Sequence, residues 1–209
     1  MGRFFNNLDR EPTGNAIKMN LTTKQLKQMI KEELSLIMES TGIPQIDGLL
    51  AQDDVESIIQ GLELAEAFGA SVDYQSLLIN KSEKTLKAIT RSRAGSEMPE
   101  LLHHIAKIAT LFTTLVSIAS NPMALPKTLE MLGRQIGVNE SNVVSRVARN
   151  PNTPMETLIK LSKHKSWIVR SGIAGRDDIP EAIIKGLLGD RVPIVRRYAQ
   201  ETLNRKKQL

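Results

Sequence analysis

The chain of 209 residues has no cysteine, few aromatic residues and no long apolar run. The missing cysteine excludes disulfides, thiolate-bound zinc, iron–sulfur clusters and a cysteine nucleophile. Aromatic residues are 3% of the chain, whereas hydrophobic residues are 41%. The core must therefore be built from Leu, Ile, Val, Ala and Met, which are the side chains that fill helix–helix interfaces. This composition favours an all-α fold.

The most apolar stretch, residues 108–119, is too short to cross a bilayer, which takes ~20 residues. It also contains three threonines, and we predict that it forms one buried helix. The opening MGRFFNNLDREPTGNAIK lacks the apolar core of an export signal. We therefore expect a cytoplasmic protein with no membrane partner.

Charge is distributed unevenly along the chain. Residues 1–140 contain 14 Lys and Arg against 17 Asp and Glu, whereas residues 141–209 contain 14 against 6. The C-terminal third is therefore strongly basic, and such a charge attracts acidic partners. Nucleic acid is the first candidate partner and an acidic protein is the second.

The N-terminal region divides into two parts. Residues 1–20 show no periodicity, and we predict a flexible arm. Over residues 21–41, Thr22 and Gln25 fit a capping box, and apolar residues then recur at steps of three and four, which predicts an amphipathic helix. Its apolar face, a predicted docking surface, consists of Leu26, Met29, Ile30, Leu34 and Ile37.

Residues 42–93 are predicted to be a helical linker region. We expect TGIPQIDGLL to be a turn-rich link, followed by a helix that Asp53 or Asp54 caps and that Gly69 ends. Two shorter helices are expected, one over about 74–79 and one over about 82–91.

A repeat occupies residues 94–203 and precedes a basic tail at 204–209. The segments RAGSEMPELLHHIAKI, IASNPMALPKTLEMLG, VARNPNTPMETLIKLS and IAGRDDIPEAIIKGLL align, and Val143, Val169 and Val195 recur at equal intervals. Their period, in the twenties, is typical of stacked solenoids, so we predict about four helical repeats. We place Pro154 and Pro180 at the first position of a helix.

The caps before these two prolines are predicted to differ. Thr153 can cap the helix that follows it, whereas in the next unit Asp177 or Asp178 must do so. The paired acids Asp53 and Asp54 are likewise predicted to be caps.

The stretch VARNPNTPMETLIKLSKHKSWIVRSGIAG resembles the leucine-rich repeat variant family. Residues 150–154, Asn-Pro-Asn-Thr-Pro, match the family pattern fully, whereas in residues 176–180 only the last proline survives. The closing DRVPIVRRYAQETL is similar to the second helix of a HEAT repeat. The resemblance implies a short right-handed α-solenoid of alternating α and 3₁₀ helices. The cysteine cluster that binds iron and sulfur in some members is absent.

The segment LTTKQLKQMIKEELSLIMES is similar to N-terminal helices of uncharacterised proteins from large tailed bacteriophages. This second resemblance implies a component of the virion. The sites at residues 30–32 and 37–39 look like those cut by prohead proteases, so the helix is either a cleaved leader or a retained docking element.

Motifs for catalysis are absent: the chain has no Gly-rich phosphate loop, no His-Glu-x-x-His and no Gly-x-Ser-x-Gly. We predict no enzyme activity, no cofactor and no metal. His103 and His104 point about 100° apart on a helix and cannot chelate one ion together. Trp167 is either packed between repeats or a stacking platform for a base.

Basic residues recur with the repeat and are the best candidates for a binding site. They are Arg146, Arg149, Lys163, Lys165, Arg170, Arg176, Arg191, Arg196 and Arg197. A ladder of positive charge suits a phosphodiester backbone. Alternatively, Arg170 and Arg196 bind carbonyls and acids of neighbouring units. The predicted function is a non-enzymatic structural or protein-interaction protein, a virion component, with a nucleic-acid-binding module as the alternative. A specific site is expected where the repeat diverges, at 150–153 against 176–179 and at 163–165 against 189–191.

Overall fold

The computed structural model describes residues 41–134 and 140–208, all of which fall within one packed unit of the chain. Every regular element in this part is a helix, which confirms the all-α prediction. The helices are α2 (Pro44–Leu50), α3 (Val55–Phe68), α4 (Tyr74–Leu78), α5 (Glu83–Arg91), α6 (Arg93–Glu97), α7 (Pro99–Ile108), α8 (Phe112–Ser120), α9 (Pro126–Gly133), α10 (Glu140–Arg149), α11 (Met155–Leu161), α12 (Trp167–Ala174), α13 (Glu181–Leu187) and α14 (Pro193–Lys206).

The predicted arm at 1–20 and almost all of the predicted helix at 21–41 lie outside the described residues. This includes the predicted docking surface and both predicted protease sites. Across residues 41–134 and 140–208, no helix is long and apolar enough to span a membrane. The same residues contain no cluster of three or more acids and histidines that could hold a metal ion.

The three helices predicted between 53 and 91 are confirmed. Asp54 caps α3 by accepting a hydrogen bond of 2.8 Å from the backbone N of Ser57. Gly69 ends the helix with φ at 64°, a left-handed conformation that glycine adopts without steric cost. Ser82 caps α5 by accepting from the backbone N of Thr85 at 3.1 Å.

Two predictions in the first half of the chain were wrong. The expected link TGIPQIDGLL contains α2, because Pro44 presets the first turn and Ile46 and Leu50, one turn apart, are both buried. Asp47 fixes the start of α2, since its Oδ1 accepts from both the backbone N and the Oγ1 of Thr41 at 2.8 Å.

The second wrong prediction is the single helix at 108–119. α7 ends at Ile108 and α8 begins at Phe112. Glu83 of α5 explains the break, because its carboxylate accepts from the backbone N of Leu111 at 3.1 Å and from the Oγ1 of Thr110 at 2.6 Å. A carboxylate that takes the free N–H groups at a helix start stabilises a new helix there.

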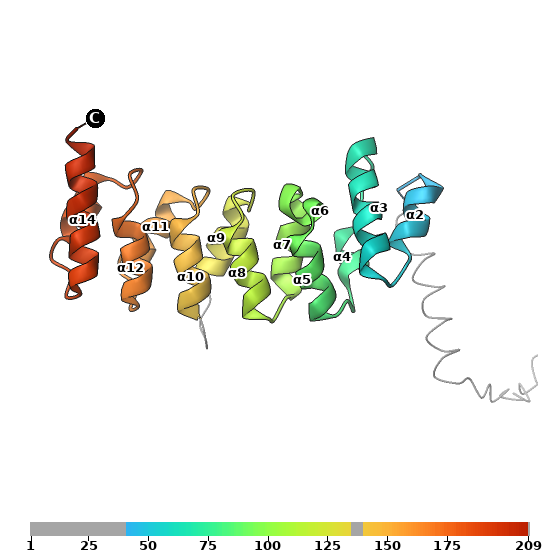
Figure 1. The fold of residues 1–209 in the computed structure, drawn as a ribbon, viewed down its shortest axis with the longest axis horizontal. Helices are drawn as coiled ribbons and strands as arrows, with labels where there is room; N and C mark the ends of the chain where they lie inside the picture. The colour runs from blue at the N-terminus through green and yellow to red at the C-terminus, as the bar shows by residue number, and fades with distance from the viewer. Residues whose placement is uncertain (1–40, 135–139, 209) are drawn as a thin grey trace, which may run out of the picture. The chain divides into compact units, whose positions relative to one another are not determined.

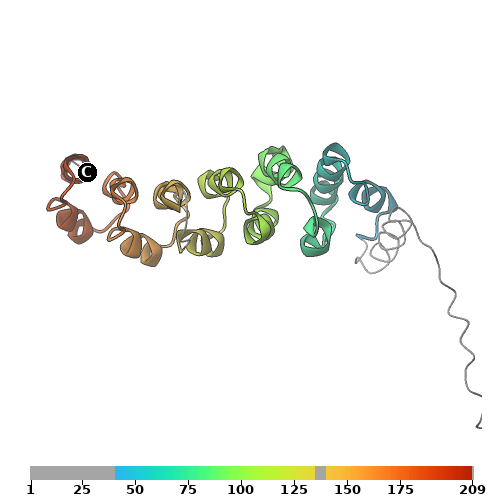
Figure 2. The same ribbon diagram turned by 90° about the horizontal axis from the view of Figure 1, so that it is seen from below.

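Helices from α8 onward pack in two layers. α8, α10, α12 and α14 are successive neighbours in one layer, and α9 packs against α11 in the other, as Figures 1 and 2 show. Positions that recur with the period of the repeat form the core between them. Val143, Val169 and Val195 are all at most 2% exposed.

The predicted caps of the repeat were wrong in detail. Pro154 and Pro180 are the N-cap residues of α11 and α13, one position earlier than expected, and neither helix has a side-chain cap. Thr153 instead donates from its hydroxyl to the carbonyl of Val147 at 2.5 Å. Asp177 and Asp178 form ion pairs with arginines.

Candidate functional site

Side chains near the helix ends join α10, α12 and α14, each to the preceding helix of the layer that they form with α8. Asn150, which follows α10, donates from Nδ2 to the carbonyls of Ala119 at 2.9 Å and Asn121 at 2.7 Å, at the end of α8. Arg176, which follows α12, donates from Nη1 to Ala148 at 3.1 Å and to Asn150 at 2.7 Å, at the end of α10. We call Asn150, Arg176 and Thr202 the helix-end ladder.

Thr202 completes this ladder from within α14. Its hydroxyl, fully buried, donates to the carbonyl of Ala174 at the end of α12 at 2.8 Å. The last carbonyls of a helix have no partner within the helix, and unpaired buried acceptors are costly. The ladder satisfies such carbonyls in three successive helices with three different side chains, spaced at the period of the repeat.

The charge of Arg176 is balanced within the same turn. Its guanidinium donates to Asp178 from Nε at 2.8 Å and from Nη2 at 2.5 Å, and its side chain is only 9% exposed. The hydrogen bond from Arg176 lowers the pKa of Asp178 below its usual range. Arg176, one of the predicted phosphate contacts, is therefore engaged inside the protein.

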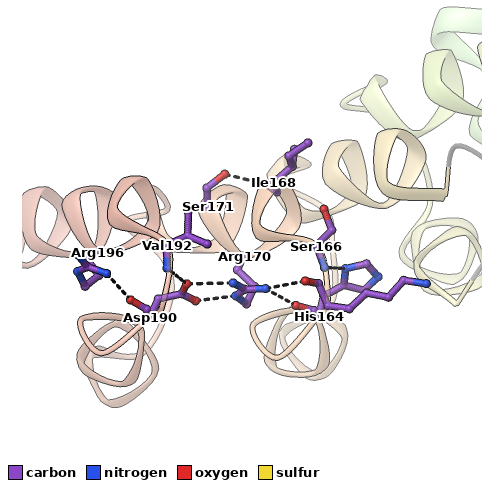
Figure 3. A network of polar contacts seen from close by, with 9 residues as sticks. His164, Ser166, Ile168, Arg170, Ser171, Asp190, Val192 and Arg196 are labelled. Atoms are coloured by element: carbon purple, nitrogen blue, oxygen red, sulfur yellow. Dashed lines mark hydrogen bonds and ion pairs between the residues drawn. The ribbon is translucent and has the colours of Figure 1, made fainter.

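Arg170 of α12 is buried, and Figure 3 shows its guanidinium between His164 and Asp190. It donates from Nη1 to the carbonyls of His164 at 2.7 Å and Lys165 at 3.0 Å. Its Nε and Nη2 donate to the two carboxylate oxygens of Asp190 at 2.6 and 2.9 Å. Four of its five N–H groups are thus used, and the bond from Arg170 lowers the pKa of Asp190.

Arg196 occupies the equivalent position one unit later. It donates from Nη1 to the carbonyl of Asp190 at 2.7 Å, as Arg170 does to His164, but its side chain is exposed. The two turns also match, since Nδ1 of His164 accepts from the backbone N two residues on at 3.1 Å, and Oδ1 of Asp190 does the same at 2.8 Å. We call residues 163–167 and 189–192 the paired turns.

Arg170 therefore has the geometry of a contact between units, because it is buried and binds Asp190 of the next turn, whereas Arg196 is exposed and binds only the turn before its own helix. Each holds the main chain of a turn six residues earlier. Arg170 also links its own turn to the next through Asp190.

Every acidic residue in the described range 141–208 lies in an ion pair. The pairs are Glu156–Lys160, Asp177–Arg205, Asp178–Arg176, Glu181–Lys185, Asp190–Arg170 and Glu201–Arg197. Three predicted site residues, Arg170, Arg176 and Arg197, belong to these pairs. The net positive charge of this third therefore resides on the other basic residues, which include Arg146, Arg149, Lys163, Arg191, Arg196, Lys206 and Lys207.

The structure separates the remaining predicted residues into two groups. Arg146 and Arg149 are exposed on α10, and Arg149 borders a cavity of about 390 Å³ between α10 and α14. Lys163, Lys165 and Arg191 are exposed on the paired turns. The other residues that line the cavity are Ser171, Gly172, Gly175, Arg176, Tyr198, Glu201 and Arg205.

Arg205 was missed, because it lies in the predicted basic tail. Its Nε donates to Oδ1 of Asp177 at 3.0 Å and its Nη2 to the hydroxyl of Thr202 at 2.8 Å. Asp177 and Arg205 are 28 residues apart, close to the repeat period, and this spacing could have indicated that the two residues lie side by side.

The single tryptophan and the two adjacent histidines have different environments. Trp167 begins α12 and is 45% exposed. His103 is buried, its Nδ1 lies 2.8 Å from the hydroxyl of Thr128, and burial lowers its pKa. His104 contacts Tyr74, with 5.8 Å between the ring centres.

Comparisons of the chain with protein-family models, with curated proteins and with solved structures find no match.

Proposed function

We propose that the protein is a non-enzymatic binding protein, built as a short right-handed α-solenoid of about four units over residues 94–203. The helix-end ladder is the observation that carries this proposal. In a solenoid each unit contacts only its neighbours, so the junctions between units supply much of the stability. Asn150, Arg176 and Thr202 supply polar contacts at three successive junctions.

The proposed mechanism is rigid presentation of a surface to another protein. A surface whose turns are already fixed by Arg170 and Arg176 loses little conformational freedom on binding. We further propose that the partner is a subunit of a tailed-phage particle and that the segment at 21–41 provides a second docking element.

Site-specific cross-linking in the native assembly tests this function. A photoreactive residue replaces Arg149, which is exposed on α10, and the control replaces Lys185, which is exposed on α13. We expect a stoichiometric cross-link to one partner protein from position 149 and a weaker one from position 185. A chain that remains monomeric in its source and cross-links from neither position contradicts the proposal.

Mass spectrometry of purified particles tests the proposed setting. We expect the chain in the particle, and its N-terminal peptide decides between a cleaved and a retained segment at 21–41. Particles that lack the chain altogether contradict a virion component.

A second candidate function is binding to nucleic acid, and the charge distribution favours it. Because all six acids of residues 141–208 are engaged in ion pairs, the surplus positive charge resides on mainly exposed side chains. Binding through phosphates releases counterions, so affinity must fall steeply as salt rises. No binding of either duplex or single strand at low salt contradicts this function.

A further inference from the structure

We propose that the paired turns form a binding site for single-stranded nucleic acid. In this site Lys163 and Arg191 contact phosphates, and Trp167 stacks on a base. This inference rests on the second candidate function above and names the surface that would perform it.

One guanidinium brings the two turns together although they belong to different units of the repeat. Arg170 binds the carbonyls of His164 and Lys165 on one edge, and the carboxylate of Asp190 on the other, with all four contacts between 2.6 and 3.0 Å. The main chain that follows Lys163 therefore lies beside the main chain that carries Arg191, as Figure 3 shows for the labelled residues around Arg170.

The paired turns carry more positive charge than their one acid can neutralise. Asp190 is that acid, and Arg170 neutralises it in a buried bidentate pair. Arg196 holds the second turn through a carbonyl, so it uses no acid. Lys163 and Arg191 are exposed and belong to none of the six ion pairs of this third. The surface of the turns is thus basic and its backbone is fixed in advance.

Trp167 supplies an exposed aromatic ring at the end of the first of the paired turns. It is the only tryptophan in the chain and is 45% exposed. Since consecutive Cα atoms are about 3.8 Å apart, its Cα lies within about 15 Å of that of Lys163. A long cationic side chain and an aromatic ring at this separation can contact a phosphate and a base of the same strand.

The aromatic residue selects the class of ligand. Stacking on a side chain requires a base whose face is free, which a single strand offers and a paired, stacked duplex does not. An acidic peptide would use Lys163 and Arg191 but would gain little from the ring. Single-stranded nucleic acid is the ligand that uses both kinds of group.

Fluorescence of the full-length chain tests the site directly, because Trp167 is the only tryptophan that can report. The probe is an oligothymidylate of about 20 nucleotides, which has no secondary structure, titrated at low and at moderate salt. We expect quenching of the tryptophan and an affinity that falls with salt.

Three variants test whether binding depends on the paired turns or only on the net positive charge of the protein. Lys163→Glu with Arg191→Glu is expected to weaken binding at least about tenfold and to make the salt dependence shallower, since about two phosphate contacts are lost.

Trp167→Leu is expected to weaken binding about fivefold or more with an unchanged salt dependence, measured by fluorescence anisotropy of a labelled oligonucleotide. Arg146→Glu with Arg149→Glu on α10 makes the same change in net charge away from the turns and is expected to have a smaller effect than the turn pair.

The outcomes distinguish failure of the site from failure of the function. If the oligonucleotide binds but leaves Trp167 unquenched, and both charge pairs weaken binding equally, the site is wrong while nucleic-acid binding stands. If no oligonucleotide binds at low salt, both fail. If polyglutamate of equal charge binds as tightly and quenches the tryptophan equally, the ligand is an acidic protein and the proposal is overturned. Circular dichroism of each variant confirms that a loss of binding is not a loss of folding.

Discussion

Arg170 and Arg196 occupy equivalent positions in α12 and α14, yet they have unequal environments. Both hold the main chain of a turn six residues earlier, at 2.7 Å. Arg170 is buried and also makes a bidentate pair with Asp190, whereas Arg196 is exposed and donates to one carbonyl. The same residue in the same place of the repeat therefore links two turns in one case, because Asp190 accepts from Arg170, and holds a single turn in the other.

The helix-end ladder shows the opposite relation. Asn150, Arg176 and Thr202 are chemically different, yet each donates to a carbonyl at the end of the preceding helix. What these junctions require is a donor at a fixed place, and an amide, a guanidinium or a hydroxyl can supply it. The position of a residue in the repeat unit therefore determines which carbonyl it binds. Its burial and the nearby acids determine how much that contact stabilises the fold.

The largest effect is expected for Arg170→Met. Removing one partner of a buried ion pair costs about 3–5 kcal/mol, and here it leaves Asp190, whose side chain is 6% exposed, without a counterion. Urea unfolding of the variant and the wild type measures the loss. The double variant with Asp190→Asn should recover part of it, because the buried charge is gone. A loss below about 1 kcal/mol would show that the pair is not buried in solution.

The next effect is expected for Asn150→Ala. It leaves the buried carbonyl of Ala119 without its donor, whereas the carbonyl of Asn121 still accepts from the backbone N of Ala124 at 3.1 Å. An unsatisfied buried group costs about 1–3 kcal/mol. Thermal or urea unfolding gives the change, with Asn204→Ala on the exposed face of α14 as the control. Equal stability of the two variants would mean that the ladder does not contribute to the junctions.

Acid pH should weaken the ion pair between Arg170 and Asp190, whereas Arg196 binds a backbone carbonyl, which does not titrate. The pKa of Asp190 in the folded protein is lowered, chiefly by the hydrogen bond with Arg170. The stability from this carboxylate is therefore fully present above the ordinary Asp pKa of about 3.9 and is lost as the pH falls through the lower folded value. In urea unfolding between pH 7 and pH 3, the wild type should lose free energy of unfolding more steeply below about pH 4 than Asp190→Asn does. Parallel curves would contradict the lowered pKa.

The smallest effect is expected for Arg196→Met. One hydrogen bond from an exposed side chain is worth less than about 1 kcal/mol, and Asp190 keeps its pair with Arg170. The same unfolding experiment measures this variant beside Arg170→Met. A loss of stability equal to that of Arg170→Met would show that Arg170 and Arg196 contribute equally to the stability of the fold.

The helices and the core could be predicted from the sequence where local chemistry decides them. Asp54 and Gly69 bound α3 through their own side chain and backbone conformation. The regular recurrence of Val143, Val169 and Val195 identified buried positions, because a repeat must place equivalent residues in equivalent packing.

The remaining features depend on contacts between distant residues. The break before α8 is set by Glu83, which is 28 residues away from Leu111. The roles of Arg170 and Arg176 were open, since an arginine in a repeat can face either solvent or a neighbouring carbonyl, and only the folded chain shows which. The candidate site changed for this reason, as the divergent turn at 176–179 proved to contain a junction contact.

In the helix-end ladder, every donor lies C-terminal to the carbonyl that it binds, and this order has a consequence for folding during synthesis. Each donor serves a carbonyl that precedes it, by 28 residues for both Arg176 to Ala148 and Thr202 to Ala174. During synthesis from the N-terminus, the carbonyls at the end of α10 lack their arginine donor until Arg176 has emerged from the ribosome, and the carbonyl of Ala174 lacks its donor until Thr202 has emerged. Folding of these helices is therefore expected to advance behind translation with a constant lag of about one repeat.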